Sequence, residues 1–107
     1  MKPDIDVVVC EVGLRDGLQL VAEFFPTREK LAWIEAEAAA GVPEIEVTSF
    51  VPARIVPQFT DAEEVVAKAL AVAGLTVAAL IPNRKGAERA FALGLHRLSF
   101  VLSVSRT

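Results

Sequence analysis

An arginine and an aspartate stand side by side directly after an apolar run near the N-terminus. The run covers residues 7–12, and Arg15-Asp16-Gly17 follows it. A carboxylate at the end of a strand can bind a hard divalent cation, and a neighbouring guanidinium can stabilise an oxyanion that develops beside that cation. An Arg/Asp pair in a turn that Gly17 makes possible is the alternative. The tripeptide therefore indicates either a metal-assisted site or an ordinary turn.

A second acid lies inside an expected strand over residues 44–49. Because side chains alternate along a strand, Glu44, Glu46 and Thr48 are expected to share one face. In a closed barrel this face points inward, where a carboxylate is costly unless it is paired, and Arg15 is the candidate partner. The alternative is an edge strand with a solvated polar face. Glu46 is thus either an interior acid that faces the site or a surface residue.

The other residues with reactive side chains favour structural roles. The single histidine, His96, is expected at the amino end of a strand, away from the site. Cys10 is expected to pack inside a strand as a small apolar residue, and Trp33 to pack against a neighbouring element. The helix glutamates, Glu37 among them, and the basic pair Arg84-Lys85 indicate a solvated surface. The sequence holds neither G-x-G-x-x-G nor a P-loop, which argues against nucleotide binding through these motifs.

Short apolar runs alternate with helical patterns along the chain. Strands are expected at residues 7–12, 44–49, 77–81 and 98–104, and helices at 27–40, 61–73 and 83–93. Thr27 and Asn83 can each cap a helix, and Asp61 followed by Glu64 forms a capping-box pattern. A glycine follows each helix, as is typical of helix ends. The order βαβαβαβ predicts an α/β fold with a parallel sheet and right-handed crossovers.

The loops that follow the strands are the expected location of the chemistry. In parallel α/β folds, ligands bind at the carboxyl ends of the strands. This edge is formed by residues 13–19, 46–58, 82–86 and 103–107. The loops after the first two strands are long and polar, whereas the turns at the opposite edge are short. Arg15, Asp16 and Glu46 are therefore expected to lie close together.

The length of 107 residues predicts at most one domain, over residues 1–107. Apolar residues make up 53% of the chain, which excludes a disordered protein. Eleven basic and 14 acidic residues give a net charge of −3, which excludes strong nucleic-acid or anionic-membrane binding. The one cysteine excludes an internal disulfide and a cysteine-only metal site. No apolar run reaches the roughly 18 residues of a membrane span, and residues 1–6 resemble no signal or transit peptide, so the cytoplasm is expected.

Four segments together resemble the hydroxymethylglutaryl-CoA lyase family. Glu-Val-Gly-Leu-Arg-Asp-Gly-Leu-Gln at 11–19 is similar to the family's first strand and loop, and Ile-Glu-Val-Thr-Ser-Phe-Val at 45–51 to its second strand end. Residues 56–61 and 82–86 resemble the two following loops. The resemblance covers essentially the whole chain. The wider group, which includes isopropylmalate and citramalate synthases, shares only the Arg-Asp-Gly core.

The resemblance implies a metal-dependent carbon–carbon lyase built on a TIM barrel. Such enzymes cleave 3-hydroxy-3-methylglutaryl-CoA into acetyl-CoA and acetoacetate and use Mg²⁺ or Mn²⁺. By resemblance, Asp16 is the metal ligand, Arg15 stabilises the enolate of acetyl-CoA, and Glu46 supports that arginine. Gln19, Ser49 and Asn83 are by the same resemblance candidate substrate contacts, with Glu11 as a supporting residue. Leu14 stands where the family usually has proline.

The length departs further from the family pattern. A TIM barrel takes about 250 residues, so 107 residues supply its first half, and the family's metal-binding histidines and catalytic cysteine would come from the other half. The chain alone is therefore expected to be inactive and to self-associate, or to pair with a complementing C-terminal half. A lyase or aldolase for another 3-hydroxyacyl-CoA and a non-catalytic half-barrel that pairs with a second chain are the alternatives.

Overall fold

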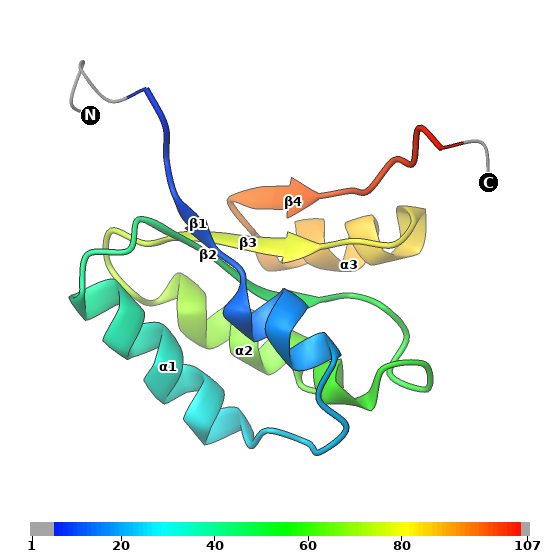
Figure 1. Cartoon of the computed structure of the whole chain (residues 1–107), viewed down its shortest axis with the longest axis horizontal. Coiled ribbons are helices and arrows are strands. Elements are labelled where there is room, and N and C mark those ends of the chain that lie inside the picture. The colour runs from blue at the N-terminus through cyan, green and yellow to red at the C-terminus, as the bar shows by residue number, and fades with distance from the viewer. Residues whose placement is uncertain (1–5, 106–107) are drawn as a thin grey trace.

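The structure is a computed structural model that describes residues 6–105. The N-terminal residues 1–6, for which no targeting peptide was expected, the loop 103–107 and the domain 1–107 therefore lie partly outside the described residues. Four parallel strands form one sheet in the order of the chain (Figure 1). They are β1 (Cys10–Glu11), β2 (Glu44–Ser49), β3 (Thr76–Leu80) and β4 (Arg97–Ser99). The predicted parallel α/β arrangement is confirmed.

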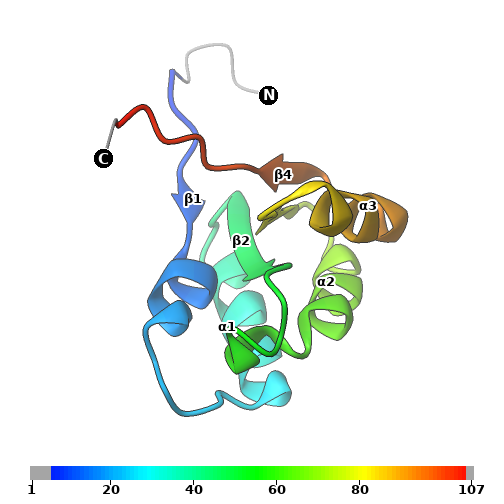
Figure 2. The same ribbon diagram turned by 90° about the vertical axis from the view of Figure 1, so that its right-hand side faces the viewer.

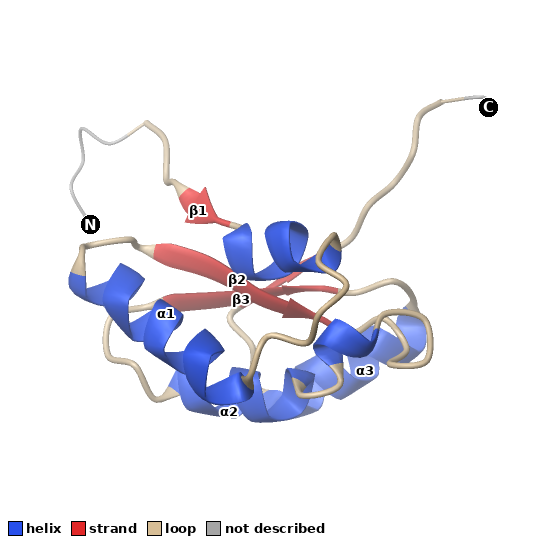
Figure 3. Cartoon of the chain, turned by 60° about the horizontal axis from the view of Figure 1, so that its bottom comes forward, coloured by secondary structure: helices blue, strands red, loops and turns tan. Residues whose placement is uncertain are grey.

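Three helices cover one face of the sheet (Figure 3). They are α1 (Thr27–Ala39), α2 (Ala62–Leu70) and α3 (Arg84–Leu93), each of which connects two neighbouring strands. Two short helices lie in segments predicted to be irregular, a π-helix η1 (Gly13–Gly17) and a 3₁₀-helix η2 (Pro57–Phe59). Both follow a strand, and they give regular structure to the two long loops at the carboxyl edge of the sheet.

The hydrophobic core lies between the sheet and the helices. Ile45 and Val47 of β2 are fully buried, as are Val65 and Val66 of α2. The close approach of η1 to α1 requires a glycine, because a Cβ atom on Gly13 would lie 2.9 Å from the Trp33 ring. This packing fixes the direction in which the chain leaves β1, and hence the position of the segment that follows Gly13.

The outer strands are shorter than predicted. Strand β1 covers two residues instead of 7–12, and β4 covers three instead of 98–104. The apolar runs beyond these two strands are exposed, with Val7 at 76% and Leu102 at 79%. Figure 2 shows that both runs leave the sheet. Among the described residues β1 pairs only with β2, and β4 only with β3. Apolar runs become strands only where a neighbouring strand accepts their backbone hydrogen bonds, and this explains the difference.

Two of the three predicted helix caps are different in the structure. Asn83 caps α3 as expected, because its Oδ1 accepts a hydrogen bond from the Gly86 N–H at 2.9 Å. Thr27, however, is the first residue of α1 and follows an N-cap proline. Asp61 occupies the N-cap position of α2 but makes no side-chain cap bond. Its carboxylate accepts bonds from Thr27 and Lys30 instead, so a charged partner replaces the predicted capping box.

Candidate functional site

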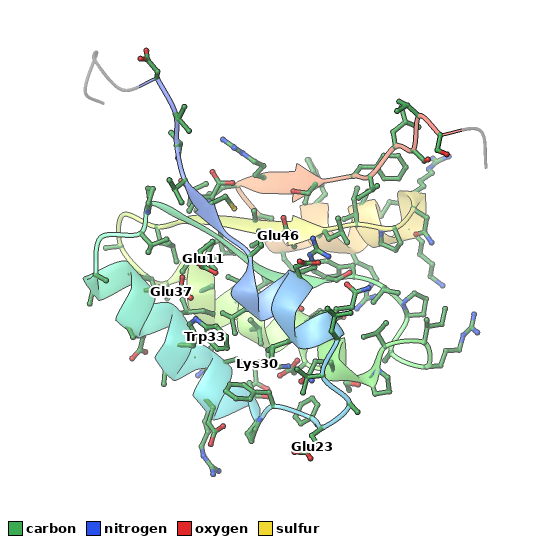
Figure 4. All side chains as sticks on the ribbon, viewed as in Figure 1. Glu11, Glu23, Lys30, Trp33, Glu37 and Glu46 are labelled. Carbon is green, nitrogen blue, oxygen red and sulfur yellow. The ribbon has the colours of Figure 1, made fainter. Side chains whose placement is uncertain are left out.

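A partly buried ion pair lies at the carboxyl edge of the sheet. Arg15 of η1 donates from Nε to Oε1 of Glu46 at 2.5 Å, and the Glu46 side chain is 8% exposed. Ser99 of β4 donates to the other Glu46 oxygen at 3.3 Å. Glu46, labelled in Figure 4, therefore connects η1, β2 and β4. Because both carboxylate oxygens are engaged, Glu46 holds the guanidinium in one orientation.

Strand β2 is central, and it is buried along its whole length. Glu46 is therefore an interior acid, and the alternative of a solvated edge strand is wrong. Glu44, also buried, pairs with Arg97 Nη1 at 3.1 Å, so each interior carboxylate has a cation, as burial of charge requires. The pairing with β3 shifts between Glu46 and Thr48, so the simple alternation that grouped Thr48 with the two acids ends at Glu46.

Arg15 also brings Asp16 and Gln19 together. Its Nη1 atom donates to Asp16 Oδ1 at 3.4 Å and to Gln19 Oε1 at 3.3 Å. The Asp16 side chain is 64% exposed, so its carboxylate is open to a ligand. The tight turn arises because the Asp16 and Arg15 N–H groups both donate to the Val12 carbonyl. The guanidinium of Arg15 thus connects two further predicted site residues, Asp16 and Gln19, to Glu46.

Ser49 and Asn83 lie at the same edge of the sheet but are engaged locally. Ser49 is buried at the end of β2, and its Oγ accepts a bond from the Val51 N–H at 3.3 Å. Asn83 follows β3 and uses its carbonyl oxygen to cap α3. Neither contacts Arg15 in the described structure, and their role in substrate binding stays a prediction.

Three residues that were assigned structural roles have them. His96 Nδ1 accepts a hydrogen bond from the Val77 N–H at 3.0 Å, at the amino edge of the sheet. Trp33 packs edge-on against Phe25 with ring centroids 5.9 Å apart. Cys10 is half-buried, and burial together with the neighbouring Glu44 carboxylate raises the pKa of its thiol from 9.0 to about 11. An inert thiol is the consequence.

Cys10 is expected to react slowly with iodoacetamide. A pKa of about 11 in place of 9.0 lowers the thiolate fraction at pH 8 about 100-fold, and only the thiolate attacks. The alkylation rate should rise tenfold per pH unit up to about pH 11. The urea-unfolded chain serves as the control and should react about 100-fold faster at pH 8. A rate that levels off below pH 10 in the folded chain would contradict the raised pKa.

Glu37 differs from the prediction of a solvated helix charge. Both of its carboxylate oxygens are buried on α1, in a shallow groove that Glu11 and Trp33 also line, and Figure 4 labels all three. Burial, followed by the Glu11 charge, raises the pKa of Glu37. Glu11 itself accepts a bond from the Gly13 N–H at 2.9 Å and so supports the start of η1, while its supporting role at the site stays a prediction.

Sequence reasoning missed a buried lysine beneath the two long loops. Lys30 of α1 is 2% exposed. Its Nζ donates to both oxygens of Asp61, at 2.8 and 3.0 Å, and to the Gln58 carbonyl at 2.6 Å. A lysine on an amphipathic helix usually lies in solvent, so its local pattern carried no signal. The capping pattern at Asp61 predicted a bond to the backbone of α2, whereas the partner of its carboxylate is Lys30.

A family model described as HMGL-like matches residues 6–107. The chain belongs to the HMGL-like family. Hydroxymethylglutaryl-CoA lyase of Bacillus subtilis is 38% identical over 101 residues, which are 94% of this chain and 34% of the relative. The cytoplasmic 3-hydroxy-3-methylglutaryl-CoA lyase of rat is 41% identical over 82% of this chain and 26% of that protein. Mitochondrial lyases, such as the mouse enzyme, also match.

A solved structure of the family confirms the fold. It is an HMG-CoA lyase from Acinetobacter baumannii in complex with coenzyme A and 3-methylmalate, with a TM-score of 0.84 and 38% identity. The match covers 92% of this chain and 32% of that one. The four parallel strands and their helices therefore correspond to the first half of the TIM barrel, as predicted. The chain spans between 22% and 34% of the length of the HMGL-like relatives reported for it.

The HMGL-like family implies a divalent metal. Asp16 fits one position of such a site, because its carboxylate is exposed and oxygen ligands suit Mg²⁺ or Mn²⁺. Within residues 6–105 no group of three or more His, Cys, Asp or Glu side chains is placed to hold an ion. Asp16 is thus suited to be one ligand among others.

Within residues 6–105, no helix is long and apolar enough to cross a membrane.

Proposed function

We propose that this chain supplies the Arg15, Asp16 and Glu46 corner of a metal-dependent lyase that cleaves 3-hydroxy-3-methylglutaryl-CoA into acetyl-CoA and acetoacetate. The observation that carries the proposal is the Arg15 guanidinium, which is fixed by a buried carboxylate and borders an exposed one. A fixed cation beside an open carboxylate suits a reaction in which a thioester gains negative charge. The similarity to the B. subtilis enzyme supports the same activity.

The cleavage breaks the bond between the hydroxyl-bearing carbon and the methylene carbon next to the thioester. The hydroxyl loses its proton and becomes the ketone of acetoacetate, while the bonding electrons move into the enolate of acetyl-CoA, which is then protonated. Arg15 stabilises the enolate oxygen, and Glu46 prevents the guanidinium from turning away. Mg²⁺ or Mn²⁺, held by Asp16 with ligands from elsewhere in the protein, would acidify the hydroxyl.

The remaining partners follow from the same assignment. We propose an acyl-CoA thioester as the substrate, with Gln19, Ser49 and Asn83 as contacts. We propose the cytoplasm as the compartment. Fractionation of cells that produce the whole protein would test this location. The exposed apolar runs beyond β1 and β4 support either a homo-oligomer or a complementing C-terminal half that covers both edges. A lyase for another 3-hydroxyacyl-CoA would use the same three residues, because Arg15 acts on the thioester carbonyl and not on the rest of the acyl chain.

A chimeric enzyme tests the proposed function. In it, this chain replaces the 101 matched residues of the B. subtilis lyase, whose own strands then cover both sheet edges. We expect Mn²⁺-dependent release of acetoacetate from the substrate, and better solubility than that of the 107-residue chain. A panel of 3-hydroxyacyl-CoA thioesters separates the two lyase candidates. A folded chimera that binds Mn²⁺ but cleaves none of them would refute the proposal.

A further inference from the structure

A single glutamine side chain holds the loop between η1 and α1. Gln58 of η2 is buried, and its Oε1 accepts a bond from the Phe25 N–H at 2.7 Å. Its Nε2 donates to the carbonyls of Glu23, at 2.8 Å, and Val21, at 3.3 Å. All the polar atoms of this side chain are therefore used on the backbone of one loop, more than 30 residues away in sequence.

The glutamine is itself held from below. Lys30 Nζ donates to the Gln58 carbonyl at 2.6 Å and pairs with Asp61. The same ammonium lies 4.6 Å from the centre of the Phe24 ring, so it contacts the loop as well. Because these contacts are buried, they are strong and poorly screened by salt. Lys30 thus anchors Gln58, and Gln58 anchors the loop.

The two segments that Gln58 joins reach the candidate site through Gln19. The first carries Gln19, which contacts Arg15, and the second follows β2, which carries Glu46. A groove of about 240 Å³ runs between residues 19–22 and 55–58. Leu20 and Ile55, 87% and 59% exposed, lie along it. The width of this groove depends on how firmly the first loop is tied to the second.

We propose that Gln58 is a positioning residue, which sets the distance between the two loops and thereby holds Gln19 beside Arg15 and keeps the groove open for the substrate. The inference rests on the proposed function only where it treats the groove as part of a substrate site. The three bonds to the loop exist without it. The loop is held by hydrogen bonds from the Gln58 side chain to backbone groups. This attachment does not depend on how the side chains of the loop pack.

Amide exchange measured by NMR on the 107-residue chain tests the attachment of the loop. In Gln58→Ala the Phe25 amide loses its acceptor, and we expect its exchange to rise about tenfold or more. Gln58→Glu keeps that acceptor but loses both donors, so the Phe25 amide should stay protected. The matched control is Val65→Ala, a buried change in α2. Fluorescence of Trp33, the one tryptophan, should shift in Gln58→Ala, because Phe25 packs against it.

The chimera tests the positioning role. We expect Gln58→Ala to raise KM for the thioester about fivefold or more while kcat changes less than twofold, with partial recovery in Gln58→Glu. Phe25 exchange no faster than in Val65→Ala would overturn the attachment. An unchanged KM in an active chimera would overturn the positioning role alone. A chimera that is inactive even with Gln58 in place removes the proposed function, and the positioning role with it, while the exchange result still stands.

Discussion

Replacing Lys30 by methionine is expected to lower the free energy of unfolding by about 3–5 kcal/mol. The substitution keeps most of the apolar volume but leaves the Asp61 carboxylate buried without its cation, and such uncompensated charges are strongly destabilising. It also removes the donor to the Gln58 carbonyl, so η2 loses a hydrogen bond from α1. Urea unfolding at pH 7, followed by circular dichroism, gives the size of the loss.

Two further variants show whether burial of the pair is the cause. Arg84→Met removes a cation from an exposed ion pair with Glu88 and should cost less than about 0.5 kcal/mol. The double variant Lys30→Met with Asp61→Asn removes both charges, and it should recover a large part of the loss because no unpaired charge remains. If Lys30→Met costs no more than Arg84→Met, the ion pair is not a main contribution to stability.

The central elements could be predicted from local sequence patterns. Strand β2 begins and ends at the predicted residues, and α3 does so within one residue. In both cases the signals are local: a glycine or proline lies beside the element, and Asn83 provides a cap whose hydrogen bond the structure contains. The parallel order followed because strands and helices alternate, which leaves few arrangements that bury every apolar face.

The outer strands and the buried lysine could not be predicted in the same way. Residues 7–9 lie beyond the start of β2, whose first residue pairs with Cys10. Whether they form a strand depends on a neighbouring strand, and their own β-branched side chains do not contain that information. Lys30 and Asp61 lie 31 positions apart in the sequence. Asp61 has the local pattern of a cap, yet a buried cation competes for its carboxylate more strongly than a backbone N–H does.

The candidate site was partly visible in the sequence because one rule locates it. Ligand-binding residues gather at the carboxyl ends of parallel strands, so Arg15 and Glu46 could be expected to meet. The hydrogen bonds and ion pairs that complete the site could not be predicted from the sequence. Ser99 reaches Glu46 from β4, 53 positions further along, and the pairing of Glu44 with Arg97 depends on the same sheet register. Register is a property of the assembled sheet, and a pattern within one strand does not fix it.

In the chimera, Arg15→Lys is expected to lower kcat about 10²–10³-fold, the loss typical of removing a donor that stabilises a developing oxyanion. The positive charge is kept, so the effect isolates geometry. The guanidinium contacts Glu46 through Nε and both Asp16 and Gln19 through Nη1. One ammonium on a flexible stem cannot make these bonds from the same position. Steady-state release of acetoacetate gives kcat and KM.

The control and a second variant separate positioning from charge. Arg84→Lys changes an exposed arginine at the start of α3 and should leave both constants within a factor of two. Glu46→Gln keeps the shape of the acceptor but removes its charge, so Arg15 is held less firmly, and kcat should fall by a smaller factor than in Arg15→Lys. An Arg15→Lys chimera whose kcat stays within threefold of the parent would show that the guanidinium does not stabilise the enolate. Glu46 would then be an interior acid that only neutralises a partly buried cation.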